Sequence, residues 1–156
     1  MKRAARVEPD VRVAALVKIP LQPAGIRRLA RAVLAAERAG LAALSVTFVG
    51  PARIRRLNRE RLRHDRVTDV IAFAFSVPVP RSPFPVVVGD VYICPSVAAA
   101  NARRHGATIK DELRRLVVHG TLHVLGHDHP ADESRTASPM WRRQERYLKR
   151  FGALAR

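Results

Sequence analysis

The sequence predicts a single α+β domain in which about four strands form a mixed sheet with helices packed on it. Four runs rich in apolar and β-branched residues are interspersed with segments whose apolar residues recur every three or four positions. Proline or glycine separates most of these segments. With 156 residues, 47% of them hydrophobic, the chain is long enough to bury one core, so we expect one domain over residues 1–156.

Strands and helices are expected in turn through the first half of the chain. Val11–Val17 is apolar enough for a first strand, and Pro23 opens a helix that we expect to stop at Gly40. Leu44–Val49 alternates like a second strand. Gly50-Pro51 then turns the chain into a short helix. The very basic stretch 58–69 is predicted to be the end of that helix and an exposed loop.

Two further strands are predicted in the middle of the chain. Val70–Phe75 is hydrophobic throughout, so we expect it to be buried on both faces. The prolines between Val77 and Pro85 predict a loop at a sheet edge. Val86–Cys94 is predicted to be a strand interrupted at Gly89-Asp90, because a glycine there indicates a bulge or the close approach of another backbone.

Three helices are predicted in the last third of the chain. Pro95–Arg104 is the first, and the second runs to Leu125 with Asp111 and Glu112 near its positive end, where carboxylates are favoured. Ser138-Pro139 is a suitable start for the third, because serine caps a helix and proline fits its first position.

Four of the six histidines lie between His119 and His129. His119 and His123 are one helical turn apart, so their rings share one face, with about 5–6 Å between Cβ atoms. Gly126 can adopt the left-handed conformation that ends a helix, and the chain can then bring His129 to the same point. Three imidazoles bind zinc at about 2.0–2.1 Å and leave the fourth tetrahedral position open, as in catalytic sites.

Three neighbouring residues qualify this hypothesis. The spacing equals that of the metzincin proteases, in which a glutamate after the first histidine is the general base. Gly120 stands at that position and cannot take a proton, which argues against peptide hydrolysis. His127 is a candidate either to support a metal ligand or to face the substrate. Asp128 is a candidate either to orient a ligand imidazole or to form the turn.

The charge favours a polyanionic partner. The chain carries 29 basic and 13 acidic residues, a formal net charge of +16, which predicts binding to nucleic acid. Compositional bias explains the choice of arginine over lysine, but it does not explain the shortage of carboxylates. We expect neither a membrane span, which needs about 20 apolar residues, nor a signal peptide. The single cysteine, Cys94, predicts a small buried side chain and fits a reducing cytoplasm.

Together the motifs resemble the YbeY family of bacterial metal-dependent endoribonucleases. That family carries His-Gly-x-Leu-His-Leu-x-Gly-[Tyr/His]-Asp-His, which His119–His129 matches except for Val124 in place of the usual leucine. Leu57-Asn58, Thr68–Phe73 and Gly89–Val91 are similar to three further family blocks.

The resemblance runs from about Val11 to the last helix and implies an α+β fold with one Zn²⁺ held by His119, His123 and His129. It implies cleavage of single-stranded RNA in the cytoplasm, near the 3′ end of the small-subunit ribosomal RNA, and a role in ribosome quality control. The implied partners are this RNA and the ribosomal small subunit, with neither membrane nor DNA expected.

One departure concerns an arginine that the family usually has four residues after the asparagine. Leu62 stands there, and the flanking Arg61 and Arg63 are the candidates to position a phosphate instead. The predicted chemistry is attack on a phosphodiester by a zinc-bound water, with arginines of Asn58–Arg66 holding the RNA backbone. Two alternatives remain, a non-catalytic RNA-binding assembly factor with a structural zinc and a metalloprotease.

Overall fold

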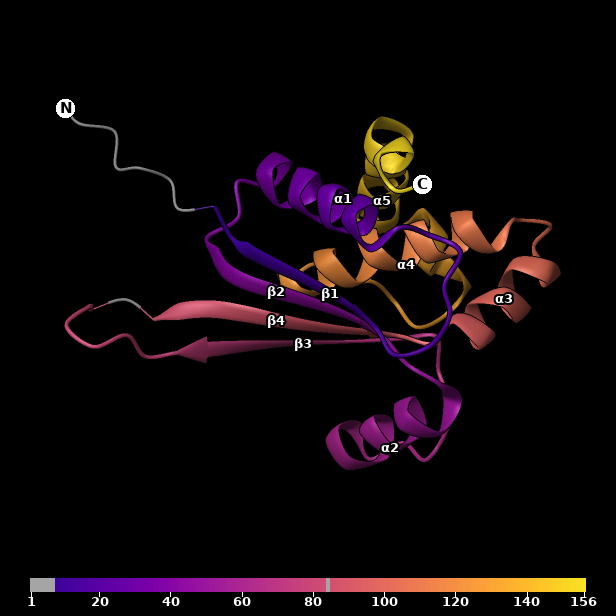
Figure 1. Cartoon of the computed structure of the whole chain (residues 1–156), viewed down its shortest axis with the longest axis horizontal. Helices are drawn as coiled ribbons and strands as arrows, with labels where there is room; N and C mark the ends of the chain where they lie inside the picture. The colour runs from indigo at the N-terminus through magenta and orange to yellow at the C-terminus, as the bar shows by residue number, and fades with distance from the viewer. Residues whose placement is uncertain (1–7, 84) are drawn as a thin grey trace.

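The computed structural model describes residues 8–83 and 85–156 and shows one α+β domain with a four-stranded mixed sheet (Figure 1). The strand order is β1-β2-β4-β3. β1 and β2 pair in parallel, as do β2 and β4, whereas β3 is antiparallel to β4. The strands are β1 (Asp10–Ala15), β2 (Leu41–Phe48), β3 (Val70–Val77) and β4 (Val86–Ile93). The predicted fold class is confirmed.

The helices divide unequally between the two faces of the sheet. They are α1 (Pro23–Ala36), α2 (Pro51–Leu62), α3 (Pro95–Arg104), α4 (Ile109–Val124) and α5 (Pro139–Phe151), with 3₁₀ turns η1 (Glu133–Ala137) and η2 (Gly152–Leu154). Figure 1 shows α2 alone on the side of the sheet opposite α1, α4 and α5. Proline occupies the first turn of α1, α2, α3 and α5, and the Ser138 hydroxyl caps α5 as predicted.

The main core lies between the sheet and helices α1 and α4. Alternate residues of β2, such as Val46 and Phe48, point into it and are fully buried, together with Val117 and Leu122 of α4. A smaller cluster under α2 contains Ile54 and the thiol of Cys94, and the predicted burial of that thiol is confirmed.

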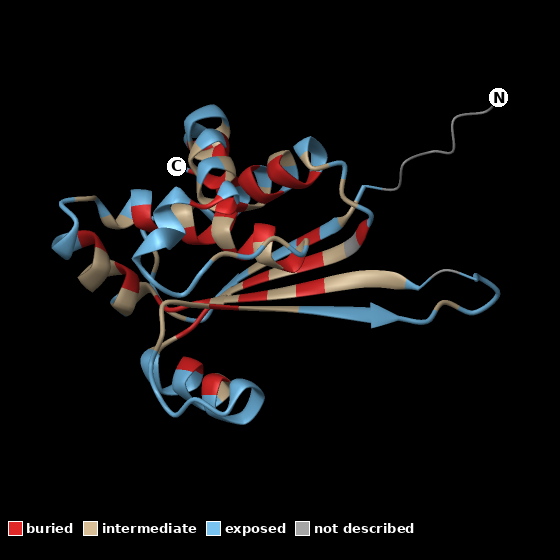
Figure 2. Ribbon diagram, turned by 180° about the vertical axis from the view of Figure 1, so that it is seen from behind, coloured by how far each residue is buried: buried red, intermediate tan, exposed pale blue. Residues whose placement is uncertain are grey.

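Two predicted features of the elements are wrong. α1 ends at Ala36 rather than at Gly40, because Arg38 takes the left-handed conformation at φ 52°. The strand predicted from Val70 is not buried on both faces. Only Ile71 of β3 is buried, and Phe75 is 38% exposed, because β3 is an edge strand whose outer half projects beyond the helices (Figure 2).

The predicted interruption of the fourth strand is also wrong, since β4 continues through Gly89 in unbroken register with β3. Gly89 does mark a close approach, but by a side chain. A Cβ there would lie 2.2 Å from Cγ1 of Val124 on α4. Gly120 of α4 faces β4 in the same way, because its Cβ would lie 2.5 Å from Cγ1 of Val91. These two glycines let α4 lie close to the sheet and fix its rotation.

Candidate metal centre

Helix α4 and the turn after it bring three imidazoles together. Because Gly120 faces the sheet, His119 and His123 point to the side of α4 where α5 packs. Gly126, at φ 93°, follows the end of the helix as predicted, and the chain turns back to place His129 beside the other two rings. The Nε2 atom of His123 lies 3.1 Å from that of His119 and 3.2 Å from that of His129, and the third distance is also 3.2 Å.

The hydrogen bonds of the opposite ring nitrogens define the tautomers of His123 and His129. His123 Nδ1 is 2.9 Å from the carbonyl oxygen of His127, and His129 Nδ1 is 2.8 Å from that of Pro130. A carbonyl oxygen only accepts, so each Nδ1 carries the proton and donates it. In the neutral rings the Nε2 atoms therefore present lone pairs.

The ring of His119 is held in the same tautomer by a side chain. Its Nδ1 donates to Oε1 of Gln144, at 2.6 Å, and Gln144 is fully buried on α5. The amide nitrogen of Gln144 donates to Glu145 at 3.2 Å, which leaves its carbonyl end facing the ring. Gln144 was not predicted from the sequence, although it interrupts the buried face of α5 formed by Met140 and Tyr147, which is a recognisable signal.

The geometry of the cluster fits one small cation. Three lone pairs that face one another without an intervening proton repel, and a shared cation removes that repulsion. Tetrahedral coordination at the usual Zn–N length separates two ligand nitrogens by roughly 3.3 Å, close to the spacing seen here. His119, His123 and His129 form a group that could bind a metal ion.

Burial keeps two of these rings neutral. It lowers the pKa of His119 to about 4, against the opposing effect of the bond to Gln144, and the charge of the nearby Arg135 contributes to the lowering. Burial is also the main cause that lowers the pKa of His123. Metal ligation by histidine requires the neutral ring, so neither has to lose a proton near pH 7.

Replacing Gln144 by methionine tests the support of His119. Methionine has nearly the same volume but no oxygen acceptor, so we expect Gln144→Met to leave the fold intact and to weaken metal affinity by about 10–100-fold. Competition with a chromophoric chelator measures that affinity. Gln144→Glu keeps an acceptor and is the matched control, and equal affinity in all three proteins would contradict a supporting role for Gln144.

His127 and Asp128 contribute differently from each other. The carbonyl oxygen of His127 supports His123, while its ring donates from Nε2 to Glu37 at 2.7 Å. Asp128 accepts the backbone N–H of His129 at 2.8 Å, as a turn residue does.

Glu37, at the end of α1, joins the turn that carries His129 to α5. Its carboxylate accepts hydrogen bonds from the ring of His127, from the hydroxyl of Tyr147 and from Nη1 of Arg143, and its side chain is only 9% exposed. Burial raises the pKa of Glu37, but these three donors outweigh it and the net pKa is lowered. Glu37 was not predicted from the sequence, because its partners lie about 90 positions or more further along the chain.

The lowered pKa of Glu37 predicts a pH-dependent loss of stability. A carboxyl whose folded pKa is depressed stabilises the fold above its unfolded pKa, and this contribution is lost as the pH falls through the folded pKa. We expect Glu37→Gln to destabilise the protein by about 1–3 kcal/mol at pH 7. The difference in the free energy of unfolding between this variant and wild type should become smaller below about pH 4.5. Urea unfolding of the chelator-treated proteins at several pH values measures both, and a difference that does not vary with pH would contradict the assignment.

The candidate phosphate-binding arginines lie on the other side of the sheet. Arg61 belongs to α2, where its guanidinium lies 5.7 Å from the ring centroid of Phe73, and Arg63 follows the end of that helix at φ 57°. Leu62 between them is 46% exposed. Within residues 8–83 and 85–156, no hydrogen bond or ion pair joins either arginine to the three histidines.

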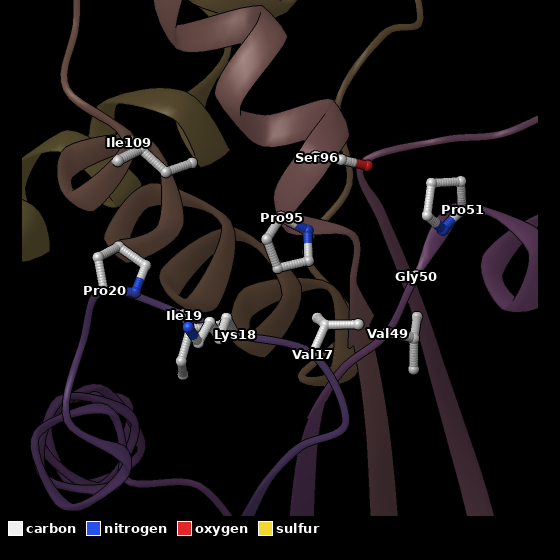
Figure 3. Close-up of a pocket in the computed structure, with 10 residues that line it drawn as sticks. All are labelled: Val17, Lys18, Ile19, Pro20, Val49, Gly50, Pro51, Pro95, Ser96 and Ile109. Carbon is white, nitrogen blue, oxygen red and sulfur yellow. The ribbon is translucent and has the colours of Figure 1, made fainter.

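A hollow of about 690 Å³ lies away from the histidines, at the N-terminal end of α4 (Figure 3). Ile109 of its lining starts α4, and His119 is about 15 Å further along that helix. Most lining side chains are apolar, as Val17 and Pro95 illustrate, and the described residues that line the hollow include no histidine, cysteine, aspartate or glutamate.

Comparison with known proteins assigns the chain to a family. The model of the family described as Endoribonuclease YbeY matches residues 17–152. The chain belongs to the endoribonuclease YbeY family. Proteins named Endoribonuclease YbeY from Staphylococcus aureus strains JH9 and Newman are 42% identical to it over 118 residues, which cover 71% of this chain and 74% of each relative.

A solved structure agrees with the fold. The solution structure of TM1509 from Thermotoga maritima matches with a TM-score of 0.61 and 24% identity, and the match covers 92% of this chain and 89% of that one. The family match and the Staphylococcus aureus relatives confirm the resemblance to the YbeY family and the prediction of an enzyme of the hydrolytic nuclease class. No helix in the described part of the chain is long and apolar enough to cross a membrane.

Proposed function

We propose that this chain is a zinc-dependent endoribonuclease that cleaves single-stranded RNA. We place its action in the cytoplasm, in maturation of the 3′ end of the small-subunit ribosomal RNA and in ribosome quality control, with the small subunit as partner. Membership of the YbeY family supports the reaction class. The net charge of +16 supports a nucleic-acid substrate.

The observation that carries the proposal is the convergence of three unprotonated Nε2 atoms at 3.1–3.2 Å on the surface of the fold. His119, His123 and His129 are each partly exposed, so an RNA phosphate can reach them. Each ring is fixed by an acceptor on its Nδ1, as expected for histidines that hold a metal. Three ligands also leave a coordination position free for substrate or water.

The residues of the chain have distinct parts in the proposed reaction. Zinc, when bound, supplies Lewis acidity toward a phosphoryl oxygen and a source of hydroxide near neutral pH. Gln144 and the carbonyl of His127 keep the lone pairs of their rings directed at the metal position. Arg135 is exposed on η1, and its charge helps to lower the pKa of His119, so it would add positive charge near the metal position. Arg61 and Arg63 would hold backbone phosphates further along the RNA strand.

Gly120 argues against peptide hydrolysis by the mechanism of a zinc protease. The protease general base would stand at its position, and a Cβ there already meets Val91 at 2.5 Å. The helix therefore has no room for the glutamate that the protease mechanism requires. Casein that remains intact with the metal-loaded protein is the expected result.

Removal and return of metal test the proposal. Chelator-treated protein should leave single-stranded RNA intact, and stoichiometric Zn²⁺ should restore cleavage, with duplex RNA of the same sequence as the control substrate. Metal analysis of the isolated protein should show zinc rather than nickel or manganese. RNA that stays uncleaved by the zinc-loaded protein, while RNA affinity persists, would favour the non-catalytic assembly factor.

A further inference from the structure

One face of the sheet is covered only at one end. Side chains alternate along β3 and β4, so Phe73, Phe75 and Val77 point away from the main core, and the antiparallel register places Tyr92 of β4 on the same face. Helix α2 packs over the inner end of this face through Ile54 and Leu57. The outer end is open, and Figure 2 shows exposed residues along the outer half of β3.

Three aromatic rings run from the part of this face under α2, where Phe73 and Tyr92 are half-buried, to the open part, where Phe75 lies beside Val77 and opposite Val88 of β4. The ring centroid of Phe73 lies 6.2 Å from that of Phe75 and 6.3 Å from that of Tyr92, so the three rings form a continuous row from the edge of α2 outward. Phe75 is 38% exposed and Val77 is 42% exposed. The same face of β2 carries small side chains instead, such as Ala43 and Ser45, so the row stands out from the rest of the sheet.

The aromatic row is bordered by a strongly basic helix. Between Pro51 and Arg66 the chain has seven arginines and two acidic residues. The guanidinium of Arg61 lies over the ring of Phe73 at 5.7 Å. Asp65 engages Arg55 and Arg59, whereas the remaining five arginines of this segment form no ion pair with any residue that the structure describes. These five are Arg53, Arg56, Arg61, Arg63 and Arg66.

We infer that this face, the open part of β3 and β4 beside α2, is a platform on which bases of single-stranded RNA stack while the arginines of α2 hold the backbone. Aromatic rings beside arginines bind unpaired bases with little sequence preference, because every base has a face that stacks. A duplex hides those faces, so the platform would select single strands. The inference rests on the proposed function and extends it with a binding surface distinct from the histidine cluster.

The charges near the row indicate where the RNA backbone would lie. Asp90 is on the same face opposite Phe73, and its carboxylate accepts the hydroxyl of Ser45 at 2.7 Å. A phosphate would be repelled there and attracted toward α2, so the backbone should follow the helix. A second copy of the chain is a poor occupant of the face, because two surfaces with this excess of arginine would repel each other.

The test measures binding apart from cleavage. A fluorescent single-stranded oligouridylate of about 12 nucleotides is titrated with the chelator-treated full chain, and anisotropy gives the affinity. Phe75→Ala should weaken binding at least about fivefold, as expected for the loss of one stacked base. Phe75→Tyr should retain the affinity. Leu16→Ala, which removes a 56% exposed apolar side chain elsewhere, should have no effect.

Two results would overturn the inference. One is an unchanged affinity of Phe75→Ala for the oligonucleotide. The other is a change in the molecular mass of the protein in solution on the same substitution, which would make the face an interface between copies. Failure of the proposed function is distinguishable from both. A zinc-loaded protein that does not cleave RNA, yet loses affinity on Phe75→Ala, would keep the platform and lose the enzyme.

Discussion

Replacement of His123 by alanine is expected to remove metal binding and RNA cleavage together. The Nε2 atom of His123 lies within 3.2 Å of the corresponding atoms of both other rings, so two imidazoles alone remain after the change. Loss of a partner that merely orients a ligand costs about 10–100-fold in metal affinity or activity. Loss of a ligand itself should therefore cost more than about 100-fold in both.

The stability of the same variant distinguishes a structural role of the metal, in which the fold depends on it, from a catalytic role. In the absence of metal, His123→Ala should be about as stable as wild type, since the substitution relieves the repulsion among the lone pairs. Zinc should raise the melting temperature of wild type and leave that of the variant unchanged, because only wild type binds it in the folded state. Metal content, melting temperature and RNA cleavage are measured on the same samples.

His105→Ala is the matched control, because His105 is exposed at the end of α3 and its ring Nδ1 pairs with the backbone carbonyl of Asn101, away from the three histidines. It should keep metal and activity. Full zinc content in His123→Ala would contradict the three-histidine site. Full cleavage without zinc would contradict the enzyme mechanism while leaving the metal site in place.

Substitution of Gly89 by alanine is expected to destabilise the fold by about 2–3 kcal/mol through overpacking. The new Cβ would lie 2.2 Å from Cγ1 and 2.9 Å from Cγ2 of Val124. A valine side chain in a helix has one strongly preferred rotamer, so it cannot rotate away from both contacts. Helix α4 would have to move off the sheet, carrying His119 and His123 with it.

A second substitution should restore the close packing. Val124→Ala removes both offending methyl groups, so Gly89→Ala with Val124→Ala should be more stable than Gly89→Ala alone. Gly40→Ala is the control, because a Cβ at Gly40 has no atom within 4 Å. Urea unfolding measures all four free energies. An unaltered free energy of unfolding in Gly89→Ala would contradict the close approach of α4 to β4.

Local patterns were sufficient to predict most elements. The helix of the histidines, the cap at Ser138 and the four strands follow from periodicity and from proline and glycine, which act within a few residues. What covers a strand is decided by segments far away in sequence. Phe75 is exposed because β3 lies at an edge and α2 is too short to reach it, and hydrophobicity alone does not reveal either fact.

The candidate site likewise combines residues that local spacing predicts with residues that only the tertiary packing brings together. The spacing of His119, His123 and His129 within one helix and its turn predicts their convergence. Glu37 directly follows α1 and Gln144 belongs to α5, and only the packing of those helices on α4 brings the two residues near the rings. A buried glutamine among apolar positions was the one available signal.

The contact between Gly120 and Val91 limits how this centre can be redesigned. Any side chain at that place would press into the middle of the sheet, so a proton acceptor cannot be grafted onto the helix between the two histidines without rebuilding β4. A new catalytic group would have to come from the side of the cluster that faces away from the sheet, for example from the turn that follows α4.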